Sequence, residues 1–97
     1  MARGSWVYLM ADRYRGAIYT GVTSNLPARA WAHREGRGSR HCARYGISRL
    51  VFAEEAPTIV EAIAREKAIK KWRREWKIEL IERGNPDWLD LYDQINW

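Results

Sequence analysis

The chain of 97 residues fits one compact domain, and its 46% of hydrophobic residues exclude a disordered chain. No run approaches the roughly 20 apolar residues of a membrane-spanning helix, and the first residues lack the apolar core of a signal peptide, so we expect a cytoplasmic protein with no membrane partner. The formal net charge of +5 predicts an anionic partner, for which nucleic acid is the obvious candidate, and one cysteine with two histidines excludes a structural zinc site.

Two short runs of β-prone residues predict a hairpin near the start of the chain. We expect strands over Trp6–Met10 and Ala17–Val22, joined by a polar segment in which Gly16 supplies a turn residue. If the residue numbers of facing pairs sum to 27, Tyr8 lies opposite Tyr19. The two phenols then share one face of the sheet, whereas a shift of the pairing by one residue would separate them.

A helix with a marked start follows the hairpin. Asn25 is a suitable N-terminal cap, and Pro27 is tolerated in the first turn, where backbone amides have no partners within the helix. We expect this helix over Leu26–Glu35, ended by the glycines beyond it. Arg29 and His33 are four residues apart and therefore share one face of the helix.

A second short helix and a third strand come next. Residues Arg40–Tyr45 predict a short helix closed by Gly46, because glycine favours the left-handed conformation at a helix C-terminus. The β-prone run Ile47–Glu54 predicts the third strand. No repeat or linker interrupts the chain, so we expect all elements to form one domain over residues 1–97.

The longest helical stretch runs from Pro57–Thr58 to about Arg83. Its first half carries an inward stripe with the three-and-four spacing of a buried helix face. The stripe comprises Ile59, Ala62, Ile63, Glu66 and Ile69. The later apolar positions cannot align with this stripe on one straight helix, so we expect a bend or break near Trp72–Arg74. A capping asparagine and a proline then predict a terminal helix over Pro86–Asp93.

Glu66 is the charged residue on that apolar stripe. A buried carboxylate is costly unless it is paired, protonated or bound to a cation. The ordinary interpretation is an ion pair with Arg29 or with a lysine. The alternative is metal ligation, since magnesium is commonly held by one or two carboxylates together with water and phosphate oxygens.

Five residues from different elements together match the chemistry of phosphodiester cleavage. On their own, Tyr8 and Tyr19 are ordinary strand residues, and Arg29 with His33 is ordinarily a solvated surface pair. Together with Glu66 they provide two phenols, a guanidinium, an imidazole and a carboxylate. We interpret this set as a candidate site for splitting a phosphodiester bond.

On these residues the chain resembles the GIY-YIG nuclease superfamily, and especially its small stand-alone bacterial members. The first signature of the family keeps only Tyr8 here, and the second keeps Tyr19 and Gly21. What makes the resemblance specific is the spacing downstream of the second signature. Arg29 and His33 stand where the family places its catalytic arginine and a frequent histidine.

Glu66 matches the metal-binding glutamate of the family, and the resemblance covers residues 6–92. It implies an α/β (α+β) fold in which helices flank a three-stranded antiparallel sheet, with the active site on the sheet face that carries both tyrosines. It also implies a magnesium-dependent DNA endonuclease, with manganese as the alternative metal. Val22 departs from the pattern, because repair-incision members carry a lysine there, and a base assisted by that lysine is excluded.

The resemblance and the needs of phosphodiester hydrolysis together assign a role to each residue. Glu66 would hold one Mg²⁺, and Arg29 would bind the scissile phosphate through its planar set of donors. Tyr19 is the candidate base for the attacking water, and Tyr8 would hydrogen-bond the water or the phosphate. A free phenol keeps its proton at neutral pH, so a neighbour must help to remove it. The metal, Arg29 and His33 are the alternatives, and His33 could itself be the proton acceptor.

Further cations close to these residues in sequence would contact the nucleic-acid backbone without reading its sequence. They are Arg34, Arg37, Arg40, Arg44, Lys67, Lys70, Lys71 and Arg74. DNA is favoured over RNA as the substrate, with single-stranded, duplex and branched forms all open, as is the oligomeric state. The alternative functions are a catalytically inactive nucleic-acid-binding module with the same fold and a domain whose basic face binds an acidic protein.

Overall fold

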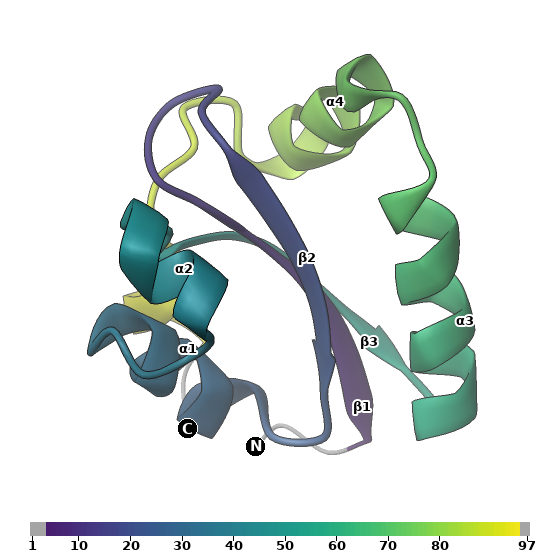
Figure 1. The fold of residues 1–97 in the computed structure, drawn as a ribbon. Coiled ribbons are helices and arrows are strands. Elements are labelled where there is room, and N and C mark those ends of the chain that lie inside the picture. The colour runs from purple at the N-terminus through teal and green to yellow at the C-terminus, as the bar shows by residue number, and fades with distance from the viewer. Residues whose placement is uncertain (1–3, 96–97) are drawn as a thin grey trace.

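In the computed structural model, which describes residues 4–95, the protein forms a three-stranded antiparallel sheet with helices on both sides (Figure 1). The strands are β1 (Ser5–Ala11), β2 (Ile18–Thr23) and β3 (Arg49–Ala56). The helices are α1 (Leu26–Arg34), α2 (Arg40–Tyr45), α3 (Ile59–Lys70), α4 (Arg74–Gly84) and the short 3-10 helix η1 (Tyr92–Gln94). The expected α+β architecture is confirmed. Within residues 4–95, no helix has the length and apolar character needed to cross a membrane.

The central strand β1 organises two separate hydrophobic clusters. It pairs with β2 on one side and with β3 on the other, in the order β2-β1-β3. Because alternate side chains of a strand point to opposite faces, Val7, Leu9 and Ala11 pack toward α3 and α4. Tyr8 and Met10 pack toward α1 and α2. All five side chains are buried, so one strand supplies the centre of both layers.

The hairpin register differs from the predicted one by two residues. Facing numbers sum to 29 instead of 27, so Tyr8 pairs with Gly21 and Met10 pairs with Tyr19. The prediction that Tyr8 lies directly opposite Tyr19 is therefore wrong. A change of two residues preserves the alternation of faces, and both phenols still lie on the α1 side of the sheet.

The hairpin loop explains the shifted register. The Asp12 carboxylate accepts a hydrogen bond from the Ala17 amide at 2.8 Å, across the base of the loop. A tight turn in which the Gly16 amide donates to the Arg13 carbonyl at 3.0 Å fills the interior. These bonds place the six-residue loop at residues 12–17 instead of 11–16, so the first strand pair is Ala11 with Ile18.

Both helices on the tyrosine face begin and end as their capping residues predict. The Asn25 side chain accepts from the Ala28 amide, and a proline lies in the first turn of α1. Helix α2 has the predicted bounds, and Gly46 closes it in the left-handed conformation with φ of 67°. The third strand begins two residues later than predicted, because the Ile47 amide donates to the Cys42 carbonyl and still belongs to the cap of α2.

The long helical stretch is broken at the point where the apolar residues move to a different face of the predicted helix. Helix α3 ends at Lys70, Arg73 is extended, and α4 begins at Arg74, so the predicted break is confirmed. The predicted inward stripe is correct at Ala62, Glu66 and Ile69, which are buried.

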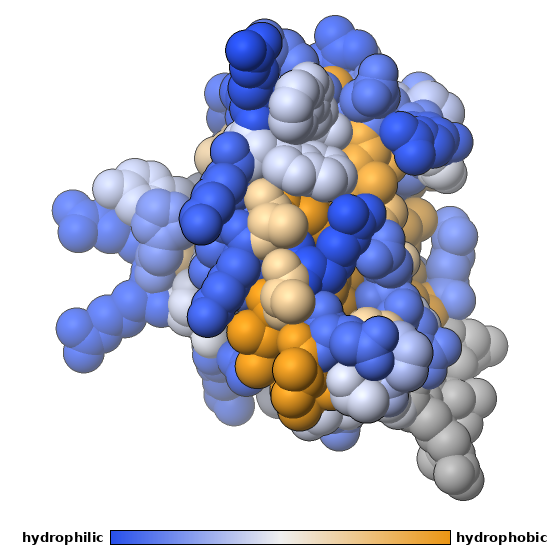
Figure 2. All heavy atoms as spheres, turned by 90° about the vertical axis from the view of Figure 1, so that its right-hand side faces the viewer, coloured by the Kyte–Doolittle hydropathy of each residue, from blue (hydrophilic) through white to orange (hydrophobic). Residues whose placement is uncertain are grey.

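The N-terminal part of that stripe is wrong. Ile59 and Ile63 are 42% and 37% exposed, and Val60 is 72% exposed. Figure 2 shows this face, with apolar side chains gathered at the bottom, where α3 begins. This first turn of α3 lies next to the last pair of the sheet, Ser5 with Ala56, and its apolar side chains stay partly exposed there.

The predicted terminal helix over Pro86–Asp93 does not form. The Asn85 side chain instead donates to the carbonyls of Val51 and Leu89 and accepts from the Leu89 amide. Trp88 adopts a left-handed conformation with φ of 57°, which ends any helix, and its indole donates to Glu82 at 2.7 Å. Only η1 is helical in this segment.

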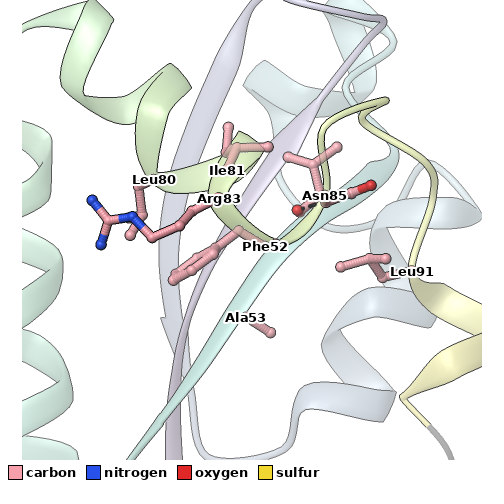
Figure 3. A pocket seen from close by; sticks show the side chains of 9 residues that line it. Phe52, Ala53, Leu80, Ile81, Arg83, Asn85 and Leu91 are labelled. Atoms are coloured by element: carbon pink, nitrogen blue, oxygen red, sulfur yellow. Dashed lines mark hydrogen bonds between the residues drawn. The ribbon is translucent and has the colours of Figure 1, made fainter.

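This C-terminal segment borders an open cavity of about 420 Å³ between α4 and β3 (Figure 3). Its walls include Phe52, Ile81 and Leu91, and Asn85 lies among them. The Leu91 amide donates to the Leu50 carbonyl at 2.8 Å and covers the start of the free edge of β3. The cavity lies by β3, whereas the two tyrosines lie on β1 and β2, so we assign it no part in the candidate site.

Candidate active site

Two phenols meet above a glycine on the α1 side of the sheet. The ring centroids of Tyr8 and Tyr19 are 6.4 Å apart. A Cβ atom at Gly21 would lie 2.5 Å from Cζ and Oη of Tyr8 and 3.0 Å from Cε2 of Tyr19. Because no real contact is that short, glycine at position 21 is what allows the two rings to approach.

His33 completes an aromatic cluster with the two tyrosines. Its ring centroid lies 5.6 Å from that of each tyrosine, and its Nε2 is 3.1 Å from the Tyr8 hydroxyl. His33 is buried, and its Nδ1 has no hydrogen-bond partner. Gly38 packs so closely on the imidazole that a Cβ there would lie 2.2 Å from Nδ1. The position of the ring is therefore fixed: Nε2 is bonded to the Tyr8 hydroxyl, and Gly38 keeps other partners away from Nδ1.

Burial sets the protonation of this cluster. It raises the pKa of Tyr8 far above its ordinary value, with smaller contributions from Tyr19 and Glu66, and Arg29 opposes the rise. Burial and the nearby Arg29 charge lower the pKa of His33. At neutral pH the pair is therefore a protonated phenol and a neutral imidazole. Tyr8 can donate a hydrogen bond, but it is a poor candidate for the base.

Arg29 stands one helical turn before His33, as its spacing predicts. Its guanidinium is exposed and makes one long hydrogen bond, from Nη1 to the Gly38 carbonyl at 3.4 Å. It lines a cavity of about 290 Å³ at the start of α1, together with Thr23 and Asn25. Most of the fork of donors is free to bind an anion in this cavity.

Glu66 forms an ion pair with a lysine, which is the ordinary interpretation of its burial. Its side chain is 12% exposed, and Oε2 lies 2.6 Å from Nζ of Lys70. Although α3 covers the opposite face of the sheet, the Glu66 carboxylate acts on Tyr8 and the Lys70 ammonium interacts with Tyr19. The charges of α3 are therefore close enough to interact electrostatically with the phenols of the hairpin.

The donor set around Glu66 fits a particular kind of metal. Residues 4–95 contain no group of three or more acidic, histidine or cysteine side chains that could hold an ion by themselves. A single carboxylate suits Mg²⁺, which keeps several waters and takes further oxygens from a phosphate. It does not suit zinc, which needs three or four protein ligands. Glu66 could thus hold Mg²⁺ only with help from a substrate.

The predicted backbone-contacting cations all have exposed side chains, and they differ in what they touch. They are Arg34, Arg37, Arg40, Arg44, Lys67, Lys70, Lys71 and Arg74. Arg74 donates to the carbonyls of Arg15 and Gly16, so it holds the hairpin loop in place. Arg37 lies over the Trp31 ring at 5.7 Å, which places a cation and a half-exposed indole side by side near Arg29.

The sequence predicted Arg29 or a lysine as the partner of Glu66 without naming the lysine, and it did not predict the role of Gly38. Lys70 was expected to contact nucleic acid, yet it pairs with Glu66. The four-residue spacing of glutamate before lysine on one helix was a readable signal for that pair. Gly38 closes the back of His33, and nothing in the local sequence distinguishes it from the neighbouring Gly36.

The sequence is similar to proteins of one known family. The family model described as the GIY-YIG catalytic domain matches residues 4–79. A UPF0213 protein of Staphylococcus epidermidis is 33% identical over 69 residues, which cover 71% of this chain and 84% of the relative. A UPF0213 protein of Clostridium perfringens is 36% identical over 77 residues, covering 79% of this chain and 82% of the relative. No solved structure matches the chain significantly. The chain therefore belongs to the GIY-YIG family.

Proposed function

We propose that this protein is a metal-dependent endonuclease that hydrolyses phosphodiester bonds in DNA. The observation that carries the proposal is the meeting of Tyr8, Tyr19 and His33 above Gly21, within reach of the charges of Arg29 and Glu66. Membership of the GIY-YIG family supports it, since the match includes all of these residues. The net charge of +5 suits an anionic polymer.

The environments of the two tyrosines favour different roles. Tyr8 keeps its proton and is bonded to His33, so it would orient the attacking water or a phosphate oxygen. Tyr19 is only half-buried, so it can release its own proton to solvent, and the resulting phenolate would accept the proton of the water. His33 is a poorer base, because Nε2 is occupied by Tyr8 and Nδ1 is closed off by Gly38.

The charged residues would hold the phosphate. Arg29 would bind its non-bridging oxygens with the guanidinium donors that are not bonded to the Gly38 carbonyl. Glu66 would hold the Mg²⁺ ion, whose charge when bound neutralises the phosphate and the leaving oxygen. Exposed cations on α1, α2 and α3 would contact the flanking phosphates, so binding should weaken as salt rises.

The test is a panel of end-labelled oligonucleotides: single-stranded, duplex and flap DNA, with single-stranded RNA. Each is incubated with the purified protein in Mg²⁺, in Mn²⁺ and in EDTA. We expect cleavage of at least one DNA substrate with either metal and none in EDTA. Salt-sensitive binding without cleavage of any substrate would replace the proposal with a binding module of the same fold.

A further inference from the structure

The candidate metal ligand already has a cation bound to it. Nζ of Lys70 lies 2.6 Å from Oε2 of Glu66, which is the distance of a strong charge-assisted hydrogen bond. Glu66 is held in place between the buried Ala62 and Ile69, whereas the Lys70 side chain is 52% exposed. The carboxylate is thus fixed, and the ammonium is free to change its position.

A divalent ion and this ammonium would compete for the same carboxylate. Within residues 4–95 no group of three or more acidic, histidine or cysteine side chains could hold an ion by itself, so the protein alone offers the ion few ligands. Two cations within bonding distance of one carboxylate repel each other, and Lys70 must move before the ion can bind. Without another partner for Lys70, this exchange weakens metal binding.

A phosphate would change that balance. The Lys70 side chain is 52% exposed and interacts electrostatically with Tyr19 as well as with Glu66, so a phosphate that arrives at the phenols can reach its ammonium. An arriving phosphate offers Lys70 an alternative anion and offers the metal the oxygens that the protein lacks. Both effects favour the same exchange.

We propose that Lys70 occupies the cation position of Glu66 in the resting protein, and that a nucleic-acid phosphate draws Lys70 away as the divalent metal binds. This inference rests on the proposed function, because it assumes a metal at Glu66. It makes metal and phosphate binding mutually dependent: each raises the affinity of the other by the same factor. Lys70 is then a positioning residue that delays metal loading until substrate is present.

The experiment measures Mn²⁺ affinity by isothermal titration calorimetry, without any nucleic acid. Lys70→Met should bind Mn²⁺ about fivefold more tightly than the unmodified protein, a factor that matches the upper range for partly exposed ion pairs. Lys70→Arg keeps the charge and should bind as the unmodified protein does. Lys71→Met removes an exposed charge one residue away and should leave Mn²⁺ affinity unchanged. Circular dichroism melting shows that each variant is folded.

The second part adds thymidine 3′,5′-bisphosphate, which offers phosphates but no phosphodiester bond to cut. It should raise the Mn²⁺ affinity of the unmodified protein, and it should raise that of Lys70→Met by a smaller factor. Equal Mn²⁺ affinities of the unmodified protein and Lys70→Met, or an equal effect of the bisphosphate on both, would overturn the exchange.

Failure of this inference can be told apart from failure of the proposed function. If Glu66→Gln binds Mn²⁺ as tightly as the unmodified protein, the ion is not at Glu66, and both the exchange and the metal role fall. If Glu66→Gln loses Mn²⁺ binding while Lys70→Met leaves it unchanged, only the exchange falls. DNA cleavage is scored separately in the oligonucleotide panel and enters neither result.

Discussion

The two faces of β1 pack against neighbours of different chemical character. On the α3 and α4 side, Val7, Leu9 and Ala11 enter an apolar cluster. The buried polar residues Glu66 and Asn85 on this side have partners. On the α1 and α2 side, Tyr8 shares its cluster with polar groups whose bonding is incomplete. The two buried side-chain atoms that lack partners in residues 4–95, Nε1 of Trp6 and Nδ1 of His33, both belong to this side.

Buried polar atoms without partners destabilise a fold, and they tend to persist where function requires them. We infer that the apolar face supplies most of the stability, and that the tyrosine face, together with Glu66 from α3, supplies the chemistry. If this division is correct, substitutions on the two faces should separate the loss of activity from the loss of stability.

The largest expected effect is on the rate of cleavage. Glu66→Ala and Arg29→Ala should each lower it by about 10²–10³, the cost of removing one group that stabilises developing charge. Both side chains contribute little to the core, because Arg29 is exposed and Glu66 is paired with a half-exposed lysine. The midpoint of urea unfolding should therefore stay almost unchanged, and a large shift would show that these residues hold the fold instead.

The next largest effect compares two neighbours that point in opposite directions. Leu9 and Met10 are both fully buried, so Leu9→Ala and Met10→Ala should each lower the free energy of unfolding by about 2–5 kcal/mol. Met10 pairs with Tyr19 and shares its face, whereas Leu9 lies in the apolar cluster. At a temperature where both variants are folded, only Met10→Ala should slow cleavage. Equal rates for the two would contradict the division of the faces.

A smaller effect is expected at Gly21, where one substitution should lower both stability and the rate of cleavage. Gly21→Ala would press a methyl group against both phenols and should cost about 1–3 kcal/mol of stability and also reduce cleavage. Gly84→Ala is the matched control, since nothing lies within 4 Å of its Cβ position and Gly84 is helical. That change should raise stability by up to about 1 kcal/mol. Urea unfolding of both variants measures the contrast.

Local signals in the sequence predicted much of this structure. Asn25 caps α1, Gly46 closes α2, and the change of apolar line predicts the break between α3 and α4. Each of these features depends on residues a few positions apart, whose preferences are intrinsic to the chain. The shared faces of Tyr8 and Tyr19 also follow from strand alternation, although their exact pairing does not.

The features that were missed depend on side chains that reach across the fold. The hairpin register depends on the Asp12 carboxylate, which accepts a hydrogen bond from the Ala17 amide at the other end of the loop. The C-terminal segment stays irregular because Asn85 bonds to the carbonyl of Val51, 34 residues earlier in the chain. Helical propensity carries no information about such partners. The position of Gly38 against His33 likewise requires the folded path of the segment after α1.

The smallest expected effect concerns pH and tests the cost of the polar face directly. Burial lowers the pKa of His33 in the folded protein, while the unfolded chain keeps the ordinary value of about 6.5. Below that pH the unfolded chain takes up a proton that the folded protein resists, so protonation favours unfolding. The unmodified protein should lose stability as pH falls from 7.5 to 5.5, and the loss should stop once the folded imidazole is also protonated.

His33→Gln removes this titration and keeps a side chain that can bond to Tyr8. The difference in melting temperature between the two proteins should therefore change with pH, with the variant gaining relative to the unmodified protein at pH 5.5. All carboxylates are common to both proteins, so their titration largely cancels in the difference. Parallel curves would mean that His33 reaches solvent in the folded state, and the closed rear wall formed by Gly38 would then no longer argue against His33 as the base.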